Sequence, residues 1–443
     1  MSAITNIADV IDHRPIVPRQ IVIVLLCLVF NMVDGFDITA MSVTAHQIGE
    51  EMQIGADRLG LVFSFSLAGM MLGAMFLAGL SDIVGRRTMV LVALVVVGVT
   101  VLLTAAVDSL PALILLRFGS GLGAGAMLAS VATLAAEYSP EKYRALAVTA
   151  VTAGYPTGAM LTGLAASAVV PEFGWRGMFV AGGAATLLLA VVAFFMIPES
   201  LQFLCKKQPP DALGRVNRIL AGIGRESLGE LPEGEAEADG GADDQTIIRK
   251  MLSLLTPDYR RTTLILWSAF FLIISTLYVL MSWIPKLIIN LGFDADVGNA
   301  AFTLYNFGGV LGIFALGWLA SRWMLSSLIG IFSALAAVLM VLFAGAAAGE
   351  AGQTALLTLI FVIGLALQGG FTGLYAVAAK VYPVQIRSTG VGWAIGLGRF
   401  GAVIGPGIAG YLIAGGFSIT ANFLMFALPL LAGGVLAYLL RIR

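Results

Sequence analysis

The chain has 443 residues, of which 59% are hydrophobic and only 12% are charged. A soluble domain carries about 25% charged residues, so this composition excludes an ordinary soluble protein and favours a protein embedded in a membrane. The 25 Lys and Arg residues nearly balance the 26 Asp and Glu residues, and this balance gives no reason to expect nucleic acid as a partner.

The first predicted membrane span, 20–43, contains two carboxylates. A helix needs about 20 apolar residues to cross a bilayer, and this run is long enough. Asp34 and Asp37 lie three residues apart, so they share one face of the helix. An aspartate at the centre of a span costs on the order of 3 kcal/mol on insertion scales, so two require a functional reason. We expect them to bind protons or ions; the alternative is a pair of helix-end acids at the membrane interface.

Cysteines and histidines are too few for a metal centre. The chain has Cys27, Cys205, His13 and His46, which form no Cys/His cluster, so we predict no metal site and no cofactor. The predicted topology also sets the two cysteines too far apart for a disulfide.

Two sets of six apolar runs are long enough to span a membrane. The runs are 20–43, 59–80, 88–107, 111–136, 145–169, 177–197, 262–289, 298–321, 325–347, 354–379, 387–413 and 418–440. The polar tract between the sets has basic ends and an acidic, Gly-rich centre, which is typical of a solvated linker. We therefore predict an all-α membrane protein with a six-helix half at 1–197, a cytoplasmic linker at 198–261 and a second six-helix half at 262–443.

A glycine-bounded turn, GLSDIVGRR, follows the second span and begins at Gly79. Asp82 can cap a helix or pair with a guanidinium, while Gly79 and Gly85 permit close packing. Together with Arg86 and Arg87 this turn is typical of an inter-helix latch, which makes these residues candidates for gating. The alternative is that the two arginines only fix the topology.

The fourth span has one basic and one acidic side chain. Arg117, near its start, is a candidate anchor for a substrate carboxylate or a partner in a proton relay; the alternative is a side chain that snorkels to the membrane edge. Glu137, near its end, is a candidate second acid for proton coupling. Its alternative role is an ion pair at the helix end, because Lys142 and Arg144 are close in sequence.

Arg399 lies about twelve residues inside the eleventh span, where snorkelling reaches poorly. A guanidinium there favours a bidentate partner, which is either an anionic substrate or a carboxylate of the protein itself. The glycines and prolines at 154–158 and 405–407 are candidate bending points of the fifth and eleventh spans.

Several aromatic and amide side chains within the spans are candidates to line a cavity, where the rings could stack on a bound molecule. Trp and Tyr near span ends more often anchor a protein at the membrane interface. The candidates are Tyr155, Tyr278, Trp283, Tyr305, Asn306, Gln368, Tyr375 and Trp393.

Basic residues predict the orientation. With the N-terminus in the cytoplasm, 20 of the 25 Lys and Arg residues fall on cytoplasmic segments or span ends. Arg58, Arg176 and Lys286 then lie outside, and Arg117 and Arg399 lie within spans. This bias predicts that both termini and the linker are cytoplasmic.

The two halves repeat. AAEYSPEKYR closes the fourth span and AAKVYPVQIR closes the tenth, so Pro140 and Pro383, and likewise Arg144 and Arg387, are 243 positions apart. Arg387 is therefore a further candidate for gating. Duplicated six-span halves indicate alternating access, with the binding site between the halves near the bilayer midplane.

The turn that begins at Gly79 resembles the signature loop of the major facilitator superfamily, with Ile83 in place of the basic residue common there. The whole twelve-span pattern is similar as well. A degenerate copy, GWLASR, follows the eighth span, and its Ser321 departs from the acid usual at that position. This departure argues against a charge-pair latch in the C-terminal half.

A narrower resemblance is to the aromatic acid:proton symporter family. It is carried by DGFD at 34–37, by the stretch from Tyr382 to Trp393, and by Gly398 to Pro406. The resemblance implies a membrane protein of the bacterial inner membrane, with protons, a small aromatic carboxylate and the lipid bilayer as its partners. It also implies that Asp34 and Asp37 serve proton coupling or substrate transport.

The predicted function is proton-coupled import of a small aromatic carboxylate by alternating access. The chain has no phosphate-binding loop of the Gly-x4-Gly-Lys-Ser/Thr type, so ATP-driven transport is unsupported, and no catalytic constellation indicates an enzyme. The alternatives are a sugar-acid importer or drug:proton antiporter of the same fold and, from another class, a membrane receptor that transports nothing.

Overall fold

The computed structural model describes residues 7–12, 15–231 and 252–440. Within these ranges the chain is built from helices joined by short turns. The helices of the first half are α1 (Ile7–Asp12), α2 (Pro18–Glu51), α3 (Ala56–Leu72), η1 (Gly73–Leu77), η2 (Ala78–Leu80), α4 (Ser81–Val84), α5 (Arg86–Thr104), α6 (Leu110–Glu137) and α7 (Glu141–Met196). They are followed by α8 (Leu201–Lys207), α9 (Ala212–Gly222), α11 (Pro257–Asn290), α12 (Ala295–Ala320), α13 (Leu325–Ala348), α14 (Gln353–Val381), α15 (Val384–Ala414) and α16 (Ile419–Leu439).

Twelve spans are present, as predicted. Eleven helical stretches in the described ranges are long and apolar enough to cross a membrane, and α7, with 56 residues, accounts for two crossings. It breaks at Gly174, whose φ of +64° is left-handed backbone that glycine adopts without strain. The break at Gly174 lies between the fifth and sixth predicted spans. At Pro156, within the fifth span, the helix continues.

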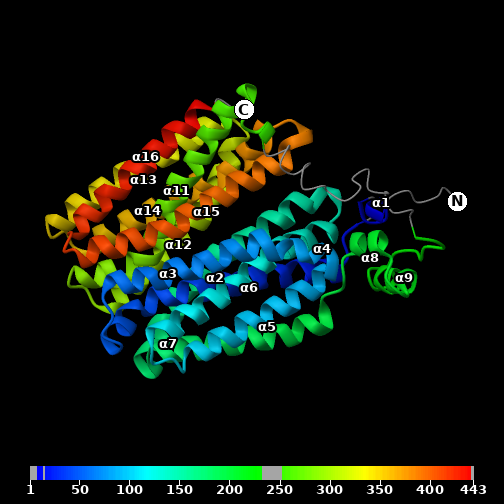
Figure 1. Cartoon of the computed structure of the whole chain (residues 1–443), viewed down its shortest axis with the longest axis horizontal. Helices are drawn as coiled ribbons and strands as arrows, with labels where there is room; N and C mark the ends of the chain where they lie inside the picture. Colours follow the sequence, from blue (N-terminus) through cyan, green and yellow to red (C-terminus); the bar gives the residue numbers. More distant parts are fainter. Residues whose placement is uncertain (1–6, 13–14, 232–251, 441–443) are drawn as a thin grey trace.

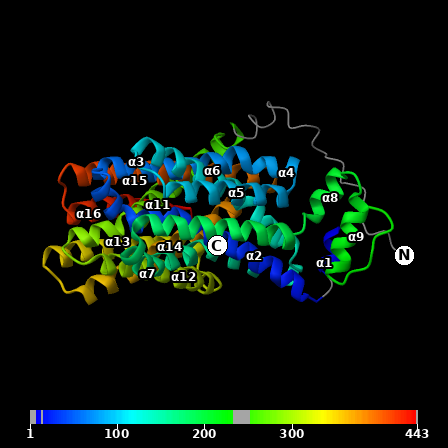
Figure 2. The same ribbon diagram turned by 90° about the horizontal axis from the view of Figure 1, so that it is seen from below.

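The spans form two bundles that lie side by side (Figure 1). Helices α2 to α7 pack on one another, as do α11 to α16, and the two bundles meet mainly through α3 with α15, α7 with α12, and α2 with α11. Figure 2 shows α8 and α9 beyond one end of the bundles, next to α1. We call this the terminal end and the other the far end.

Backbones approach closely at glycines within each half. A Cβ atom on Gly35 of α2 would lie 2.1 Å from the carbonyl oxygen of Tyr155 on α7, and one on Gly364 of α14 would lie 2.0 Å from the carbonyl oxygen of Tyr305 on α12. Real Cβ atoms do not come this close to an oxygen, so these positions admit glycine only. Small residues permit such packing where lipid supplies no hydrophobic driving force.

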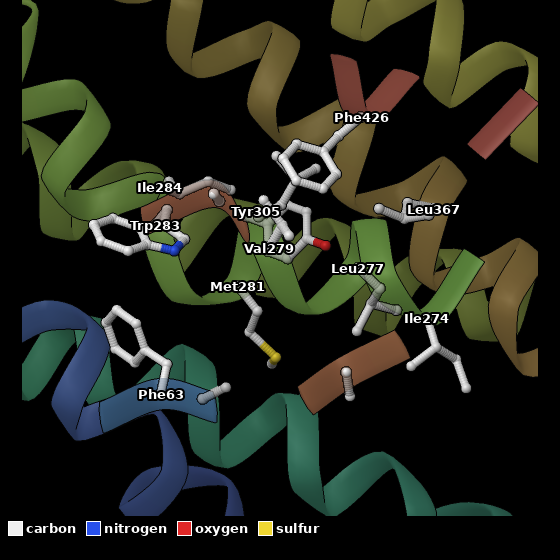
Figure 3. Packing of buried hydrophobic residues seen from close by; sticks show 14 of the residues in the cluster. Phe63, Ile274, Leu277, Val279, Met281, Trp283, Ile284, Tyr305, Leu367 and Phe426 are labelled. Atoms are coloured by element: carbon white, nitrogen blue, oxygen red, sulfur yellow. The ribbon is translucent and has the colours of Figure 1, made fainter. Parts of the chain in front are cut away.

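The halves touch at the far end. A Cβ atom on Gly60 of α3 would lie 3.2 Å from the Cα atom of Gly410 on α15. The rings of Phe63, on α3, and Trp283, on α11, meet edge to face with centroids 5.3 Å apart (Figure 3). Trp283 also donates a 3.0 Å hydrogen bond to the carbonyl oxygen of Pro406. The far end is therefore sealed by contacts between the two halves.

The same face of α15 is open toward the terminal end. Gly410, Arg399, Gly396 and Gly392 share this face, because their spacings of 11, 14 and 18 residues are close to whole helical turns. In the described ranges, no atom lies within 4 Å of where a Cβ atom on Gly396 or Gly392 would be. The halves therefore diverge toward the terminal end, and Arg399 lies where the interface begins to open.

Two short helices within the polar tract were not predicted. Ser200 caps α8 by accepting a 3.0 Å hydrogen bond from the backbone N–H of Phe203. Ala212, Val216 and Leu220 form the buried stripe of α9, at the spacing expected for one helix face. Cys205 is buried, and burial raises the pKa of its thiol to about 11. Cys27 and Cys205 are both free.

Candidate functional site

Asp37 and Arg117 form an ion pair inside the N-terminal half. Arg117 donates from Nη1 to Oδ1 of Asp37 at 2.8 Å and to the Asp37 carbonyl oxygen at 3.2 Å. Its Cζ atom lies 5.1 Å from the ring centroid of Phe179. Both charged residues are buried, with exposed fractions of 1% for Asp37 and 0% for Arg117. The snorkelling alternative for Arg117 is therefore wrong, and its guanidinium is paired with Asp37 inside its own half.

Asp34 is equally buried, with an exposed fraction of 2%, and among the described residues neither of its oxygens has a hydrogen-bond partner. The charges that act on it are those of Asp37 and, across the interface between the halves, Arg399. Asp34 and Asp37 lie in the middle of α2 and not at its end. The alternative of helix-end acids at the membrane interface is therefore wrong.

Three tyrosines surround this position. Tyr155 on α7 interacts electrostatically with Asp34, Arg399 and Tyr278 on α11. Tyr375 on α14 interacts with Arg399 and Tyr278. The structure therefore brings together five predicted residues from five helices and from both halves.

Arg399 is half-buried and, within the described part of the chain, has no hydrogen bond or ion pair. The predicted alternative of an ion pair within the protein is thus not formed in this conformation. The ring of Tyr375 packs edge to face on Phe270 and Phe371, with centroid distances of 5.7 and 5.2 Å. A guanidinium without a partner beside an aromatic wall suits an aromatic carboxylate.

Three other predicted cavity residues make their contacts elsewhere. Gln368 donates a 3.3 Å hydrogen bond to the Tyr305 carbonyl oxygen, and Asn306 donates a 2.9 Å hydrogen bond to that of Phe302. Both are buried within the C-terminal half. Trp393 packs on Trp267, with ring centroids 6.2 Å apart. Tyr305 and Trp283 belong to the apolar packing shown in Figure 3.

A small cavity between α2, α3 and α11 was missed by sequence reasoning. Its lining includes Ser42, Ser66, Ser282 and Tyr278, and the buried Ser66 hydroxyl has no hydrogen-bond partner. Ser42 is eight residues from Asp34, about two turns along α2 and about 80° around it. Small polar residues two turns beyond the aspartates in the first span are the signal that could have identified this cavity.

The latch residues of the turn contact their own half. Arg86 pairs with Asp82 at 2.8 Å. The backbone N–H of Arg87 donates to Oε1 of Glu199 at 3.0 Å, and Gly85 has a φ of +99° that favours glycine. Glu199 was missed because it lies more than a hundred positions away in sequence. A Cβ atom on Gly79 would have no atom of the described residues within 4 Å of it.

Glu137 lies beside this latch and not beside Asp34. Its Oε2 accepts a 2.5 Å hydrogen bond from the Ser200 hydroxyl, and it interacts electrostatically with Arg86. Twenty residues of α6 separate it from Arg117, a distance of about 30 Å. Its role in proton coupling stays a prediction.

Arg144 forms a 2.5 Å ion pair with Asp12 of α1, so it is not the partner proposed for Glu137. The side chain of Arg387, its counterpart in the repeat, lies outside the described residues.

Replacing Asp82 with asparagine is expected to impair transport without unfolding the protein. Asp82 is exposed and pairs with Arg86 one turn away, and such surface pairs contribute less than about 1 kcal/mol. A gating role of this turn would instead appear when the terminal end closes. We expect an unchanged unfolding temperature and a lower uptake rate in proteoliposomes. Normal turnover would contradict the gating role.

The family model described as Major Facilitator Superfamily matches residues 25–347 and 266–443. A 4-hydroxybenzoate transporter, PcaK, of Pseudomonas aeruginosa is 34% identical to the chain over 95% of this chain and 92% of the relative. A gallate transporter of Pseudomonas putida is 29% identical over 97% and 94% of the two chains.

A crystal structure of a D-xylose–proton symporter superposes with a TM-score of 0.72 at 15% identity, covering 94% of this chain and 96% of that chain. This likeness concerns the fold. The matches of sequence and fold span nearly the whole chain, so this multi-pass membrane protein belongs to the Major Facilitator Superfamily, a family of transporters and not of enzymes.

Proposed function

We propose that this protein imports a small aromatic carboxylate together with protons by alternating access. The observation that carries the proposal is Arg399, which has no ion pair within the described ranges and faces the buried carboxylate of Asp34 across the interface between the halves. Tyr155, Tyr278 and Tyr375 surround this position. Relatives named for 4-hydroxybenzoate and gallate support an aromatic acid as the substrate.

The terminal end is proposed to face the cytoplasm, in agreement with the basic residues of the sequence. The protein would then lie in the inner membrane with both termini inside the cell. Because the far end is sealed and the face of α15 is open near Gly392, this conformation corresponds to the inward-open state.

Transport then follows from rocking of the two halves, proposed as 1–197 and 262–443, around the site between them. In the outward-open state, a proton binds at the acidic face of α2 and the substrate carboxylate binds Arg399. Both must favour the occluded state over the open one for transport to be coupled. The latch around Asp82 and Arg86 controls closure of the terminal end.

Counterflow into proteoliposomes tests the function. Vesicles loaded with unlabelled 4-hydroxybenzoate are diluted into radiolabelled 4-hydroxybenzoate or benzoate, and net uptake is measured separately under an imposed pH gradient. We expect counterflow of the aromatic acids to persist with a protonophore, whereas net accumulation collapses with it. Uptake of sugar acids or export of cationic drugs, with no flux of aromatic acids, would overturn the proposal.

Replacing Arg399 with lysine tests the carboxylate anchor. Lysine keeps the positive charge but cannot form the two parallel hydrogen bonds of a guanidinium. We expect the half-saturation concentration for the aromatic acid to rise at least about tenfold, which corresponds to the loss of roughly 1.4 kcal/mol. Initial uptake rates over a concentration series give this value. Unaltered affinity would argue against bidentate binding.

A further inference from the structure

The two carboxylates on α2 have different surroundings, although sequence alone treats them as equivalent. Asp37 accepts a 2.8 Å hydrogen bond from the guanidinium of Arg117, which belongs to the same half. Asp34 is 2% exposed, and both of its oxygens lack a hydrogen-bond partner in the part of the chain that the structure describes. Arg117 thus pairs with Asp37 and does not pair with Asp34.

This difference decides which acid can exchange a proton. An ionised carboxylate paired with an always-charged guanidinium in an apolar interior keeps its charge. A buried carboxylate without a partner is costly when charged, and it tends to take up a proton instead. Asp37 is thus held by Arg117, whereas Asp34, with no such partner among the described residues, is the candidate to exchange a proton.

The groups that face Asp34 come from four helices. Asp37, on the same helix, opposes its charge, whereas Arg399 on α15 favours its charge. Tyr155 on α7 and Tyr278 on α11 complete the surroundings. Asp34 is thus poised between one repulsive and one attractive charge, and the attractive charge is the one that has no ion-pair partner.

We propose that Asp34 alone exchanges the transported proton, that Arg399 couples this proton to the substrate, and that the pair of Asp37 and Arg117 stays intact as a positioning element. The proposal rests on the proposed function. When the substrate carboxylate pairs with Arg399, the positive charge that favours ionised Asp34 is neutralised. Asp34 then accepts one proton from water and becomes a neutral acid.

Coupling is reciprocal, as for any two linked binding events. A proton on Asp34 removes the competing negative charge near Arg399 and thereby strengthens binding of the substrate. One monocarboxylate and one proton are taken up together, so the net charge of the site stays the same. Substrate affinity must consequently weaken as the pH rises through the range in which free Asp34 is ionised.

The test measures binding of 4-hydroxybenzoate by isothermal titration to the purified full-length protein across the neutral pH range. For wild type we expect the dissociation constant to rise by up to about tenfold per pH unit, the slope for one linked proton. Asp34→Asn, which mimics the protonated acid, is expected to bind with a constant that does not depend on pH.

Asp37→Asn is the matched control, since it makes the same chemical change three residues away. We expect the dissociation constant of the Asp37→Asn protein that remains folded to depend on pH as that of wild type does. Its unfolding temperature should fall because Arg117 loses its counter-charge. A pH slope that persists in Asp34→Asn, or one that disappears in Asp37→Asn, would overturn the assignment.

A second measurement needs no variant and therefore covers the case in which a variant fails to fold. 4-Hydroxybenzoate is added to wild-type protein in weakly buffered solution that contains a pH-sensitive dye. We expect net uptake of up to one proton for each molecule bound, with the uptake disappearing at acid pH where Asp34 is already protonated. Binding without proton uptake at any pH would refute the coupling.

These outcomes separate the inference from the function beneath it. If the wild type binds no aromatic acid at any pH, both the proposed function and the inference are wrong. If the wild type binds and transports but shows the reversed pattern in the two variants, only the inference is lost.

Discussion

Asp37→Asn is expected to unfold more easily than any other conservative substitution in the first span. It leaves the guanidinium of Arg117, which has an exposed fraction of 0%, without a counter-charge. A guanidinium cannot lose its proton to escape this cost. Breaking a buried pair in this way costs about 3–5 kcal/mol. The measurement is the unfolding temperature in detergent, followed by intrinsic fluorescence.

Two comparisons make the result specific. Asp34→Asn removes a carboxylate without a direct partner, so it is expected to leave the unfolding temperature unchanged or raise it. The double variant Asp37→Asn with Arg117→Met removes both charges and should recover most of the lost stability. If the double variant is as unstable as Asp37→Asn alone, the ion pair is not the cause.

Gly410→Leu is expected to prevent closure of the far end. A Cβ atom at this position would lie 2.6 Å from the carbonyl oxygen of Ala56 and 3.0 Å from the Cα atom of Gly60. Overpacking costs about 1–3 kcal/mol, which shifts an equilibrium between two conformations by about 5- to 150-fold. We expect the inward-open state to be depopulated and net uptake to fall by a similar factor, while the protein remains folded.

Chemical labelling detects this shift directly. Ser42→Cys places a thiol in the small cavity between α2, α3 and α11, where the seal at Phe63 and Trp283 covers it. A membrane-impermeant maleimide added outside should label this thiol faster in the Gly410→Leu background. Gly345→Leu, on the exposed side of α13, has open space around it and serves as the control. Equal labelling in both backgrounds would contradict the gate.

Much of this architecture could be predicted because lipid imposes simple rules on sequence. Charged residues in long apolar runs are rare, so Asp34, Asp37 and Arg399 were identified as candidate site residues from their position alone. The twelve spans were predicted for the same reason. The repeat at Pro140 and Pro383 indicated two halves that face each other.

The partners of these charges could not be predicted, because they depend on helix rotations that no local pattern records. Asp34 and Asp37 share a helix face, yet a difference of about 60° around the helix directs one toward Arg117 and leaves the other facing Arg399. Glu199 meets the backbone of Arg87 only through the tertiary fold. The helix α9 is short and lies in a polar tract, where weak periodicity does not distinguish it from a linker.

The contact between Gly35 and Tyr155 has a consequence for redesigning cargo preference. The backbones of α2 and α7 touch there without room for a single methyl group, so the ring of Tyr155 cannot be repositioned without displacing the aspartates. Tyr278 and Tyr375 come from the opposite half, and among the described glycines none meets the backbone of either tyrosine. Libraries aimed at bulkier or differently substituted acids should therefore diversify these two tyrosines and leave α7 untouched.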